Sequence, residues 1–440
     1  MPKTKEIGVH VPEILLPKPG IDLKKWAVVA CDQFTSQPEY WQTVSDYIGD
    51  SPSALHLILP EVWLESDDVK DRIAATKATM RRYFDEDIFE AHQGMMLVER
   101  GVGGGTQTGL VVALDLECYD YNKGSQTLIR ATEGTILDRL PPRMEVRRGA
   151  PIELPHILVL YDDPEMKVLE QVQAHKQELE IAYDLDLMQG SGHLTGRWVD
   201  QPDLIASIKT ALSDLIEPTT YATKYDLPGT MPPLLFAMGD GNHSLATAKA
   251  IWEEQKPHVG MDHPARYALV ELVNLHDPSL KFEAIHRVLF NASASLLEGL
   301  DSELGELVKV WSTDDFESMA LAVNDPNATH QRFGVITPEK YLVYELLTPS
   351  HNLPVGNLQP YLDSYLKQNL NVKIDYVHGD DVVNTLGRSM GNVAFYLPAI
   401  GKNAFFRTII LDGALPRKTF SMGHAKDKRF YMECRKIVAS

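Results

Sequence analysis

Four polar side chains that could do chemistry stand together in the segment Gly239–Ser244: Asp240, Asn242, His243 and Ser244. An aspartate can hold Mg²⁺, and a histidine can bond a phosphoryl oxygen or move a proton. A hydroxyl beside a histidine is also the pairing used in acyl transfer, but sequence neighbours at a helix start rarely have the mutual geometry for it. A loop that only caps a helix needs one such side chain, so we interpret this segment as a binding or catalytic loop.

The residues around the loop predict how it is positioned. The apolar run 234–238 is typical of a buried strand, and the pattern over 245–252 is typical of a helix. Gly239 and Gly241 free the backbone between them, and the Asn or Ser of the loop can cap the helix. A strand that ends in such a turn points N–H groups and the positive end of a helix dipole at a ligand. The segment therefore predicts a cradle for a phosphate or a nucleotide.

A cluster of arginines upstream of the loop could offset the charge of such a ligand. Five arginines lie within residues 130–148, and three of them, Arg139, Arg143 and Arg147, are four residues apart, so on a helix they would share one face. A Pro-Pro pair between the first two makes a continuous helix doubtful. A solvated surface held by salt bridges is the alternative explanation of the same charge pattern.

The composition is that of a globular protein with more than one domain. The chain has 440 residues, of which 44% are hydrophobic and 23% are charged, and this length exceeds what one compact core holds. A change of composition near residues 291–300 predicts two domains, 1–290 with the polar loop and 291–440. Short strands and helices alternate without a steady βαβ rhythm, which favours an α+β (mixed α/β) fold over a doubly wound sheet.

Charge, hydropathy and cysteine content disfavour several classes of protein. The net charge of −19 disfavours nucleic acid as the main partner, because that binding depends on neutralising phosphates. No apolar run approaches the roughly 20 residues of a membrane helix. The N-terminal segment lacks the apolar core of a signal peptide, so we expect a cytoplasmic protein. The cysteines are too far apart for a disulfide framework or a zinc site.

The glycine-rich segment 101–109 is not interpreted as a nucleotide loop. The residues after it are typical of a strand, so no helix opens behind it. We predict the turn of a hairpin between strands 95–98 and 110–116. Further along, the pattern predicts a strand over 155–161, a helix over 202–216 and strands over 267–274 and 282–290.

Several segments resemble one family in order along the chain. The segment Asp240–Ser244 resembles the Asp-Gly-His-His-Arg signature of the family catalogued as domain of unknown function 1015 (DUF1015). Further segments are similar to the other motifs of that family: Glu133–Thr135 with Arg139, Leu160–Pro164, Asn274–Pro278 with His286–Arg287, and Leu415–Thr419. The resemblance covers nearly the whole chain.

The resemblance implies a fold and an activity. The signature loop of the family is similar to that of the ParB/sulfiredoxin superfamily, which implies a ParB/sulfiredoxin-like N-terminal part with a smaller C-terminal α/β domain. A nucleotide-dependent free-serine kinase is among those relatives. This implies phosphoryl transfer from ATP or ADP, with Mg²⁺, to serine or a similar small hydroxylated metabolite. Sulfiredoxin chemistry is not implied because the loop has no cysteine.

The same resemblance assigns roles to residues. Asp240 would hold Mg²⁺, Glu133 would accept the hydroxyl proton, and His243 would bond a phosphoryl oxygen or move a proton. The other predicted binding residues hold the nucleotide or line its site: Gly239, Gly241, Asn242, Ser244, Arg139, Arg143, His286 and Arg287. A lone histidine in a strand is more often a core residue, and this is the alternative explanation of His286.

Two positions depart from the signature. Asn242 replaces the first histidine and Ser244 replaces the arginine, which removes a bidentate phosphate donor. Either Arg139, Arg143 or Lys249 supplies that charge, or this branch has a different ligand or no catalysis. The leading hypothesis is an Mg-dependent phosphotransferase. The alternatives are a non-catalytic sensor that binds a nucleotide or an amino acid and reports to a partner, and a hydrolase that uses Ser244. A homodimer is also considered.

Overall fold

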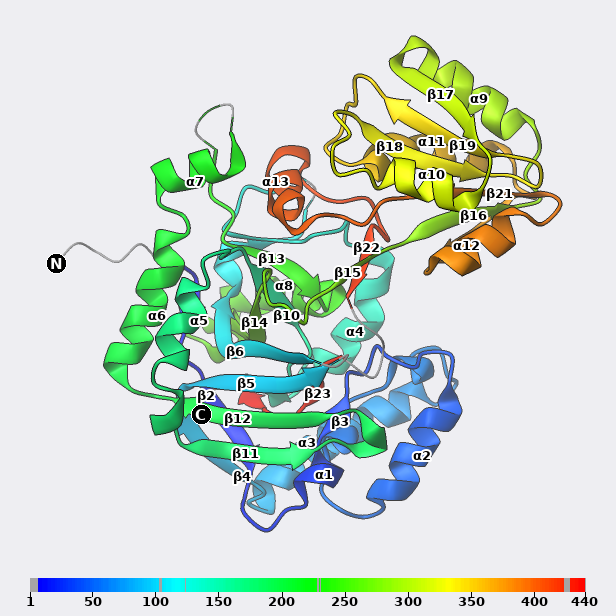
Figure 1. Cartoon of the computed structure of the whole chain (residues 1–440). Helices are drawn as coiled ribbons and strands as arrows, with labels where there is room; N and C mark the ends of the chain where they lie inside the picture. The colour runs from blue at the N-terminus through cyan, green and yellow to red at the C-terminus, as the bar shows by residue number, and fades with distance from the viewer. Residues whose placement is uncertain are drawn as a thin grey trace. The chain divides into compact units, whose positions relative to one another are not determined.

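The computed structural model describes residues 7–102, 105–122, 124–227, 229, 231–422 and 428–439 (Figure 1). Strands and helices are mixed along the chain, which confirms the mixed α/β class. The chain divides into two compact units. Unit 1 comprises Met1–Leu280 with Gly423–Ser440, and unit 2 comprises Lys281–Met422. In the described part of the chain, no helix combines the length and the apolar character that crossing a membrane requires.

A ten-stranded mixed sheet forms the centre of unit 1. Its order is β11-β12-β5-β6-β14-β10-β13-β8-β7, and β1 adds beside β6. β13 lies inside the sheet, antiparallel to β10 and parallel to β8, so its end is fixed from both sides. The strands are β1 (Val9–His10), β5 (Met95–Val102), β6 (Gly105–Asp115), β7 (Tyr119–Asp120), β8 (Ile129–Arg130), β10 (Leu158–Tyr161), β11 (Ile181–Asp186), β12 (His193–Val199), β13 (Phe236–Asp240) and β14 (Tyr267–Asn274).

Helices of unit 1 pack around this sheet (Figure 1). α4 packs against α8, and α5 packs against α6. The first of these contacts brings the arginine-rich segment to the helix that follows the polar loop. The helices are α1 (Leu23–Trp26), α2 (Pro38–Ile48), α3 (Val69–Asp85), α4 (Leu140–Arg147), α5 (Lys167–Gln173), α6 (Pro202–Asp214), α7 (Pro218–Tyr225) and α8 (Asn242–Val259).

Most local predictions for this unit are confirmed. β5 and β6 pair as the predicted hairpin, although residues 103–104 of its turn lie outside the described residues. The helix predicted over 202–216 is α6, and β14 has the bounds of the predicted strand. These segments carry clear periodic patterns of apolar residues, which is why they could be predicted from the sequence.

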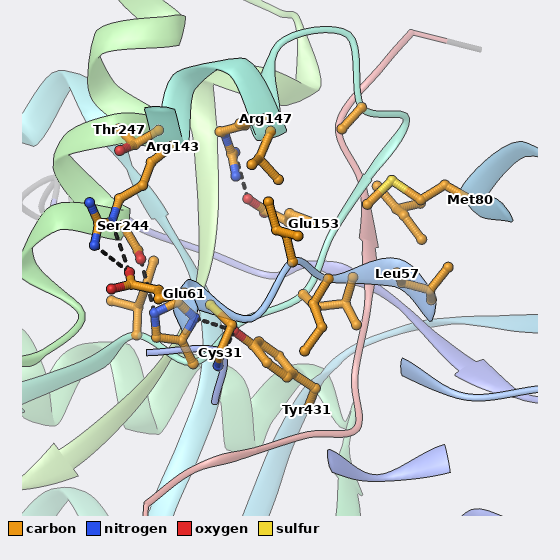
Figure 2. Close-up of a pocket in the computed structure, with 18 of the residues that line it drawn as sticks. Cys31, Leu57, Glu61, Met80, Arg143, Arg147, Glu153, Ser244, Thr247 and Tyr431 are labelled. Carbon is orange, nitrogen blue, oxygen red and sulfur yellow. Dashed lines mark hydrogen bonds and ion pairs between the residues drawn. The ribbon is translucent and has the colours of Figure 1, made fainter. Parts of the chain in front are cut away.

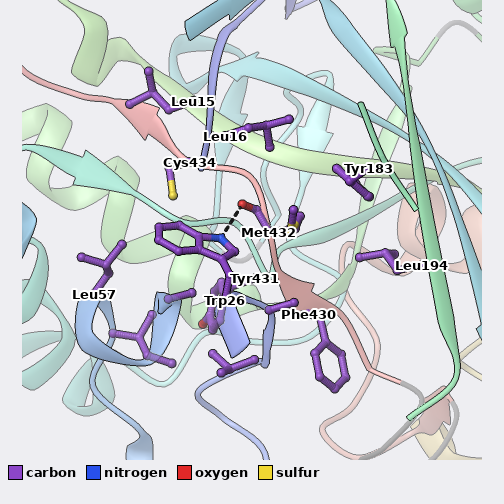
Figure 3. Packing of buried hydrophobic residues seen from close by; sticks show 14 of the residues in the cluster. Leu15, Leu16, Trp26, Leu57, Tyr183, Leu194, Phe430, Tyr431, Met432 and Cys434 are labelled. Carbon is purple, nitrogen blue, oxygen red and sulfur yellow. Dashed lines mark hydrogen bonds between the residues drawn. The ribbon is translucent and has the colours of Figure 1, made fainter. Parts of the chain in front are cut away.

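One hydrophobic core of unit 1 surrounds Trp26 (Figure 3). The indole is fully buried, and its Nε1–H donates to the Met432 carbonyl oxygen at 3.0 Å. Leu15, Leu57 and Phe430 belong to the same cluster. This core therefore joins the start of the chain to its C-terminal segment.

The C-terminal segment returns to unit 1 after the whole of unit 2. β23 (Phe430–Tyr431) pairs with β3 (Val28–Val29), and β24 (Arg435–Lys436) pairs with β9 (Ile152–Glu153). β2 (Glu13–Pro17) pairs with β4 (Phe89–Gln93). The compact units differ here from the predicted domains 1–290 and 291–440. A pattern read along the chain cannot show that a last segment pairs with strands near the start.

Unit 2 has a sheet and a core of its own. Its six-stranded antiparallel sheet has the order β17-β19-β18-β21-β16-β20, and Val288, Met319 and Val343 lie in its core. β15 and β22 form a separate pair. The strands are β15 (Phe282–Ala284), β16 (His286–Phe290), β17 (Val308–Thr313), β18 (Gln331–Ile336), β19 (Tyr341–Leu346), β20 (Lys373–Val377), β21 (Asn392–Tyr396) and β22 (Phe420–Met422); the helices are α9 (Ser295–Leu304), α10 (Phe316–Val323), α11 (Pro354–Gln368), α12 (Asp380–Gly387) and α13 (Lys402–Asp412).

Candidate functional site

The polar loop leaves β13 through two glycines. A Cβ at Gly239 would lie 2.6 Å from Leu158 Cδ2, so this position lets β13 pass close to β10. Gly241 has φ 77° and ψ 27°, a left-handed conformation that glycine adopts without strain. The Gly241 carbonyl accepts the N–H of Ser244 at 3.0 Å, and α8 begins at Asn242. The strand thus turns directly into a helix, as predicted, but neither Asn242 nor Ser244 caps it. The N-cap residue is Gly241, no side chain caps this end, and Asn242 and Ser244 already belong to the helix.

The first turn of α8 has the backbone properties of an anion site. The helix is 18 residues long and has no acidic residue in its first turn. The first N–H groups of a helix have no acceptor within the helix, and the aligned peptide dipoles give this end a partial positive charge. A phosphate or carboxylate is the kind of group that such an end accommodates.

Asp240 is paired through both carboxylate oxygens. Oδ1 accepts the N–H of Gly241 at 2.8 Å, and Oδ2 lies 2.8 Å from Lys428 Nζ. Burial acts to raise the pKa of Asp240, but the Lys428 ammonium and the Gly241 N–H outweigh it and hold the pKa below its ordinary value. The carboxylate is therefore charged at neutral pH and held in place.

This arrangement does not fit the predicted Mg²⁺ role of Asp240. An ammonium occupies one carboxylate oxygen and a backbone N–H the other. In the described ranges, no group of three or more His, Cys, Asp and Glu side chains gathers to hold a metal. Mg²⁺ prefers oxygen ligands in a near-octahedral arrangement, and a carboxylate paired with lysine is poorly suited to supply one.

Two polar atoms at the start of α8, Asn242 Oδ1 and His243 Nε2, are buried and have no hydrogen-bond partner among the described residues. Burial lowers the pKa of His243 to about 4, and the charges of Arg143 and Arg139 act in the same direction. The imidazole is therefore neutral at pH 7. Buried polar atoms are rarely left without a partner in a folded protein, which favours a ligand at this place.

Two of the predicted arginines share a side of α4. Arg143 Nε donates to Glu61 Oε1 at 2.9 Å, and Arg147 Nη2 lies 2.6 Å from Glu153 Oε2. The two prolines occupy the first turn of α4, where their missing N–H groups are not needed. Arg139 precedes the helix and is exposed, and its carbonyl oxygen accepts from Arg143 Nη1 at 2.8 Å. The prolines thus start the helix rather than interrupt it.

A chain of hydrogen bonds runs from Ser244 to the C-terminal segment (Figure 2). Ser244 Oγ lies 2.9 Å from His156 Nε2, and His156 Nδ1 lies 2.7 Å from the Tyr431 hydroxyl oxygen. The backbone N–H of Cys31 donates to that hydroxyl oxygen at 3.2 Å. Asp32 Oδ2 is 3.9 Å from His156 Nε2. The serine of the loop therefore has a histidine partner that is distant in the sequence.

Ser244 and Thr247 form part of the wall of a pocket (Figure 2). The pocket has a volume of about 140 Å³. Arg143 and Arg147 also line it, each with its glutamate partner. Most of the remaining wall is apolar and includes Leu57, Leu59, Met80, Ile152, Leu154 and Leu269.

Glu133 lies beside the end of β13. β8 runs parallel to β13, and just beyond it the hydroxyl of Thr132 donates to the carbonyl oxygen of Met238. Glu133 is the next residue and is partly buried. Glu133, predicted as a base, thus follows a residue bonded to β13, and its catalytic role stays a prediction.

His286 and Arg287 belong to unit 2 and are held within it. His286 Nδ1 accepts the N–H of Leu397 at 3.1 Å, and its ring stacks on Tyr396 with the ring centres 4.6 Å apart. Arg287 donates to the carbonyl oxygen of Arg417 at 3.0 Å. These contacts explain both residues as buried parts of unit 2. Their predicted place at a nucleotide stays a prediction.

Sequence reasoning missed His156, Tyr431 and Lys428. His156 stands in the predicted strand 155–161, where only the apolar neighbours were interpreted. Its partner Tyr431 is 275 positions away, and Lys428 is 188 positions from Asp240. No local pattern could connect residues so far apart.

A family match covers most of the chain. The family described as "Protein of unknown function (DUF1015)" matches residues 15–365. The chain belongs to the DUF1015 family. This confirms the resemblance that the ordered motifs carried. The segment with Tyr431 and Lys428 lies beyond the matched residues.

Some solved structures resemble this DUF1015 protein at low identity. A conserved hypothetical protein from Pyrococcus furiosus has 12% identity and a TM-score of 0.37, over 74% of this chain and 95% of that one. A free serine kinase in complex with AMP has 12% identity and a TM-score of 0.37, over 74% and 91%. SbnI with a C-terminal truncation, from Staphylococcus aureus, has 8% identity and a TM-score of 0.27, over 66% of this chain and 84% of that one. No curated protein matches the sequence.

Proposed function

We propose that this DUF1015 protein is a nucleotide-dependent phosphotransferase that acts on a small hydroxylated metabolite. In this proposal the nucleotide phosphates lie at the start of α8. The supporting observation is His243 Nε2, which is buried without a partner among the described residues at the N-terminus of an 18-residue helix. A neutral imidazole there can donate to a phosphoryl oxygen, and the helix end favours the negative charge.

The surrounding residues support the same proposal. Gly239 and Gly241 let the backbone approach the phosphates without a Cβ in the way. Arg143 is already paired with Glu61, so Arg139, which is exposed, is the better placed to offset phosphate charge. Glu133 is the base predicted from the sequence. No step is assigned to Mg²⁺, because Asp240 is already paired with Lys428.

Nucleotide consumption tests this proposal directly. The protein would be incubated with ATP or ADP, with and without Mg²⁺, and with a panel of hydroxylated metabolites that includes serine. ³¹P NMR would detect the phosphorylated product. We expect acceptor-dependent consumption that falls by about 100-fold or more in His243→Ala, since one preorganised donor is worth roughly 10²–10³ in rate.

A matched control and a binding measurement make the outcome clear. His175→Ala removes an exposed histidine outside the loop, and it should keep the rate of the unchanged protein. Thermal shift would report nucleotide binding independently of turnover. Nucleotide binding without turnover, whatever the acceptor, would contradict the phosphotransferase and support the sensor.

A further inference from the structure

The pocket beside α8 shares the first turn of that helix with the polar loop. Ser244 and Thr247 line the pocket from α8, and Ile157 lines it from the chain before β10. A Cβ at Gly241 would lie 3.1 Å from the Cα of Ile157, so the glycine that starts the helix packs directly on the pocket wall. A ligand in the pocket would therefore lie next to the predicted phosphate site.

The wall of this pocket indicates the chemistry of its ligand. Leu59, Met80 and Leu154 belong to a largely apolar wall. The two arginines of the wall are each paired with a glutamate, so the pocket offers no unpaired cation to an acid group. Its volume of about 140 Å³ is close to the roughly 150 Å³ of a cavity that takes benzene. The size and lining suit an apolar body of about six carbon atoms.

The polar end of the pocket is arranged to receive a proton. The His156 side chain is only 8% exposed, and its two ring nitrogens face Tyr431 and Ser244. When Nδ1–H donates to the Tyr431 oxygen, Nε2 carries the lone pair and accepts the hydroxyl proton of Ser244. The Asp32 carboxylate lies 3.9 Å from the same Nε2.

We propose that this pocket binds the phosphoryl acceptor, a hydroxylated compound with an apolar body of about six carbon atoms, and that Ser244 and His156 remove its proton. The inference rests on the proposed phosphotransferase and names its acceptor class. It assigns the base to His156 rather than to Glu133. Serine itself would leave most of the apolar wall unfilled.

The proposed step conserves atoms and charge. The acceptor hydroxyl donates to Ser244 Oγ, and the Ser244 proton passes to His156 Nε2 as the acceptor O–H bond breaks. The acceptor oxygen forms a bond to the terminal phosphorus of the nucleotide. The bond from that phosphorus to the bridging oxygen breaks, and its electron pair stays on the leaving nucleotide.

Binding tests the pocket without any need for turnover. Cyclohexanol has a six-carbon body and a hydroxyl, and its methyl ether lacks the donor. Calorimetry or ligand-observed NMR should show that cyclohexanol binds at least tenfold more tightly than serine and more tightly than the ether. Ala150→Leu narrows the pocket and should weaken the binding of cyclohexanol at least tenfold. Ala206→Leu, on the exposed side of α6, should leave that binding unchanged. Equal binding to the Ala150→Leu variant would overturn the inference.

Turnover with cyclohexanol and nucleotide tests the proton path. His156→Gln should lower the acceptor-dependent rate by about 100-fold or more, with nucleotide binding by thermal shift retained as proof of folding. Ser244→Ala should lower it similarly, and Ser244→Thr, which keeps a hydroxyl, should restore most of it. Full activity in His156→Gln together with loss in Glu133→Gln would overturn the assignment of the base.

Two further outcomes separate the failure of this inference from failure of the proposed function. Without nucleotide consumption by any acceptor the phosphotransferase fails, while cyclohexanol binding and its loss in Ala150→Leu still decide the pocket. Covalent labelling of Ser244 by a fluorophosphonate would identify a nucleophile and overturn its role as a relay.

Discussion

His243 owes its protonation state to residues outside its own loop. Its pKa is lowered to about 4 by burial, with Arg143 and Arg139 acting in the same direction. Since the ordinary value is near 6.5, the imidazole is neutral where a free histidine would begin to charge. A neutral ring at a helix N-terminus adds no repulsion to the nearby arginines, and it can still bond an anionic ligand.

Removing the charge of Arg143 should raise the pKa of His243. The Arg143→Met variant keeps much of the side-chain volume but not the positive charge, so we expect the pKa to move from about 4 toward the ordinary value. Titration of the imidazole proton resonances by NMR measures this. Arg148→Met removes an exposed charge paired with Glu254 and should leave the titration unchanged. An unaltered titration in Arg143→Met would show that the arginine does not act on this ring.

The lowered pKa of His243 also makes the stability of the folded protein depend on pH. Between pH 6.5 and about 4 the unfolded chain binds more protons at His243 than the folded chain does. His243 therefore contributes stability that is present above pH 6.5 and is lost as the pH falls toward 4. Raising its pKa in Arg143→Met narrows that window, so the part of the acid destabilisation due to His243 becomes smaller.

At the scale of single residues, a site can be predicted from the sequence when its residues are neighbours along the chain. Gly239–Ser244 was identified because its glycines and polar side chains stand in one turn between a strand and a helix. The distant partners of Ser244 and Asp240 could not be predicted, because they come from the chain just before β10 and from the C-terminal segment. Their proximity depends on which strands pair, and one sequence carries no direct signal of that.

Among the elements, short strands at the end of the chain have the largest effect on the candidate site. β23 brings Tyr431 to His156, and the residue before it in the chain, Phe430, enters the core around Trp26. The segment 429–437 holds two short strands, β23 and β24. Their partners, β3 and β9, give the segment its importance.

Truncating Phe430 should destabilise unit 1. Its side chain is 1% exposed, and a buried Phe→Ala change costs about 3–5 kcal/mol through lost burial and the cavity left behind. Urea unfolding followed by tryptophan fluorescence would measure the loss in Phe430→Ala. Leu370→Ala, at a side chain that is 88% exposed, should change the free energy of unfolding by less than about 0.5 kcal/mol. If Phe430→Ala lowered the free energy of unfolding by as little as Leu370→Ala, this segment would not be part of the core.

At the scale of the whole molecule, unit 2 is inserted into unit 1. Phe282 and Met422, near the two ends of unit 2, are paired opposite each other in β15 and β22. Unit 2 begins at Lys281, ten residues before the boundary at 291 that the composition change predicts. The end of the unit was not predicted, because the chain after it continues with similar short apolar segments.

Because its ends are adjacent, unit 2 should be removable. We expect unit 1 to remain folded when Lys281–Met422 is replaced by a short Gly-Ser linker. The pairing of β15 with β22 holds the two ends of unit 2 together, so the linker has only a short distance to span. Circular dichroism and a cooperative thermal transition would check the fold, and thermal shift would check nucleotide binding. Retained binding would show that His286 and Arg287 are not needed for it, and lost binding by a folded unit 1 would show that unit 2 contributes to it.

The late return of the chain to unit 1 also sets an order of events during synthesis on the ribosome. Unit 2 is complete at Met422, while unit 1 still lacks β23 and β24. Domains generally fold as units as the chain emerges. The inserted unit can therefore reach its native state first. Trp26, Asp240 and His156 obtain their C-terminal partners, Met432, Lys428 and Tyr431, only when residues 428–436 have been made. Nascent chains stopped before that point would expose the apolar surface around Trp26 to chaperones.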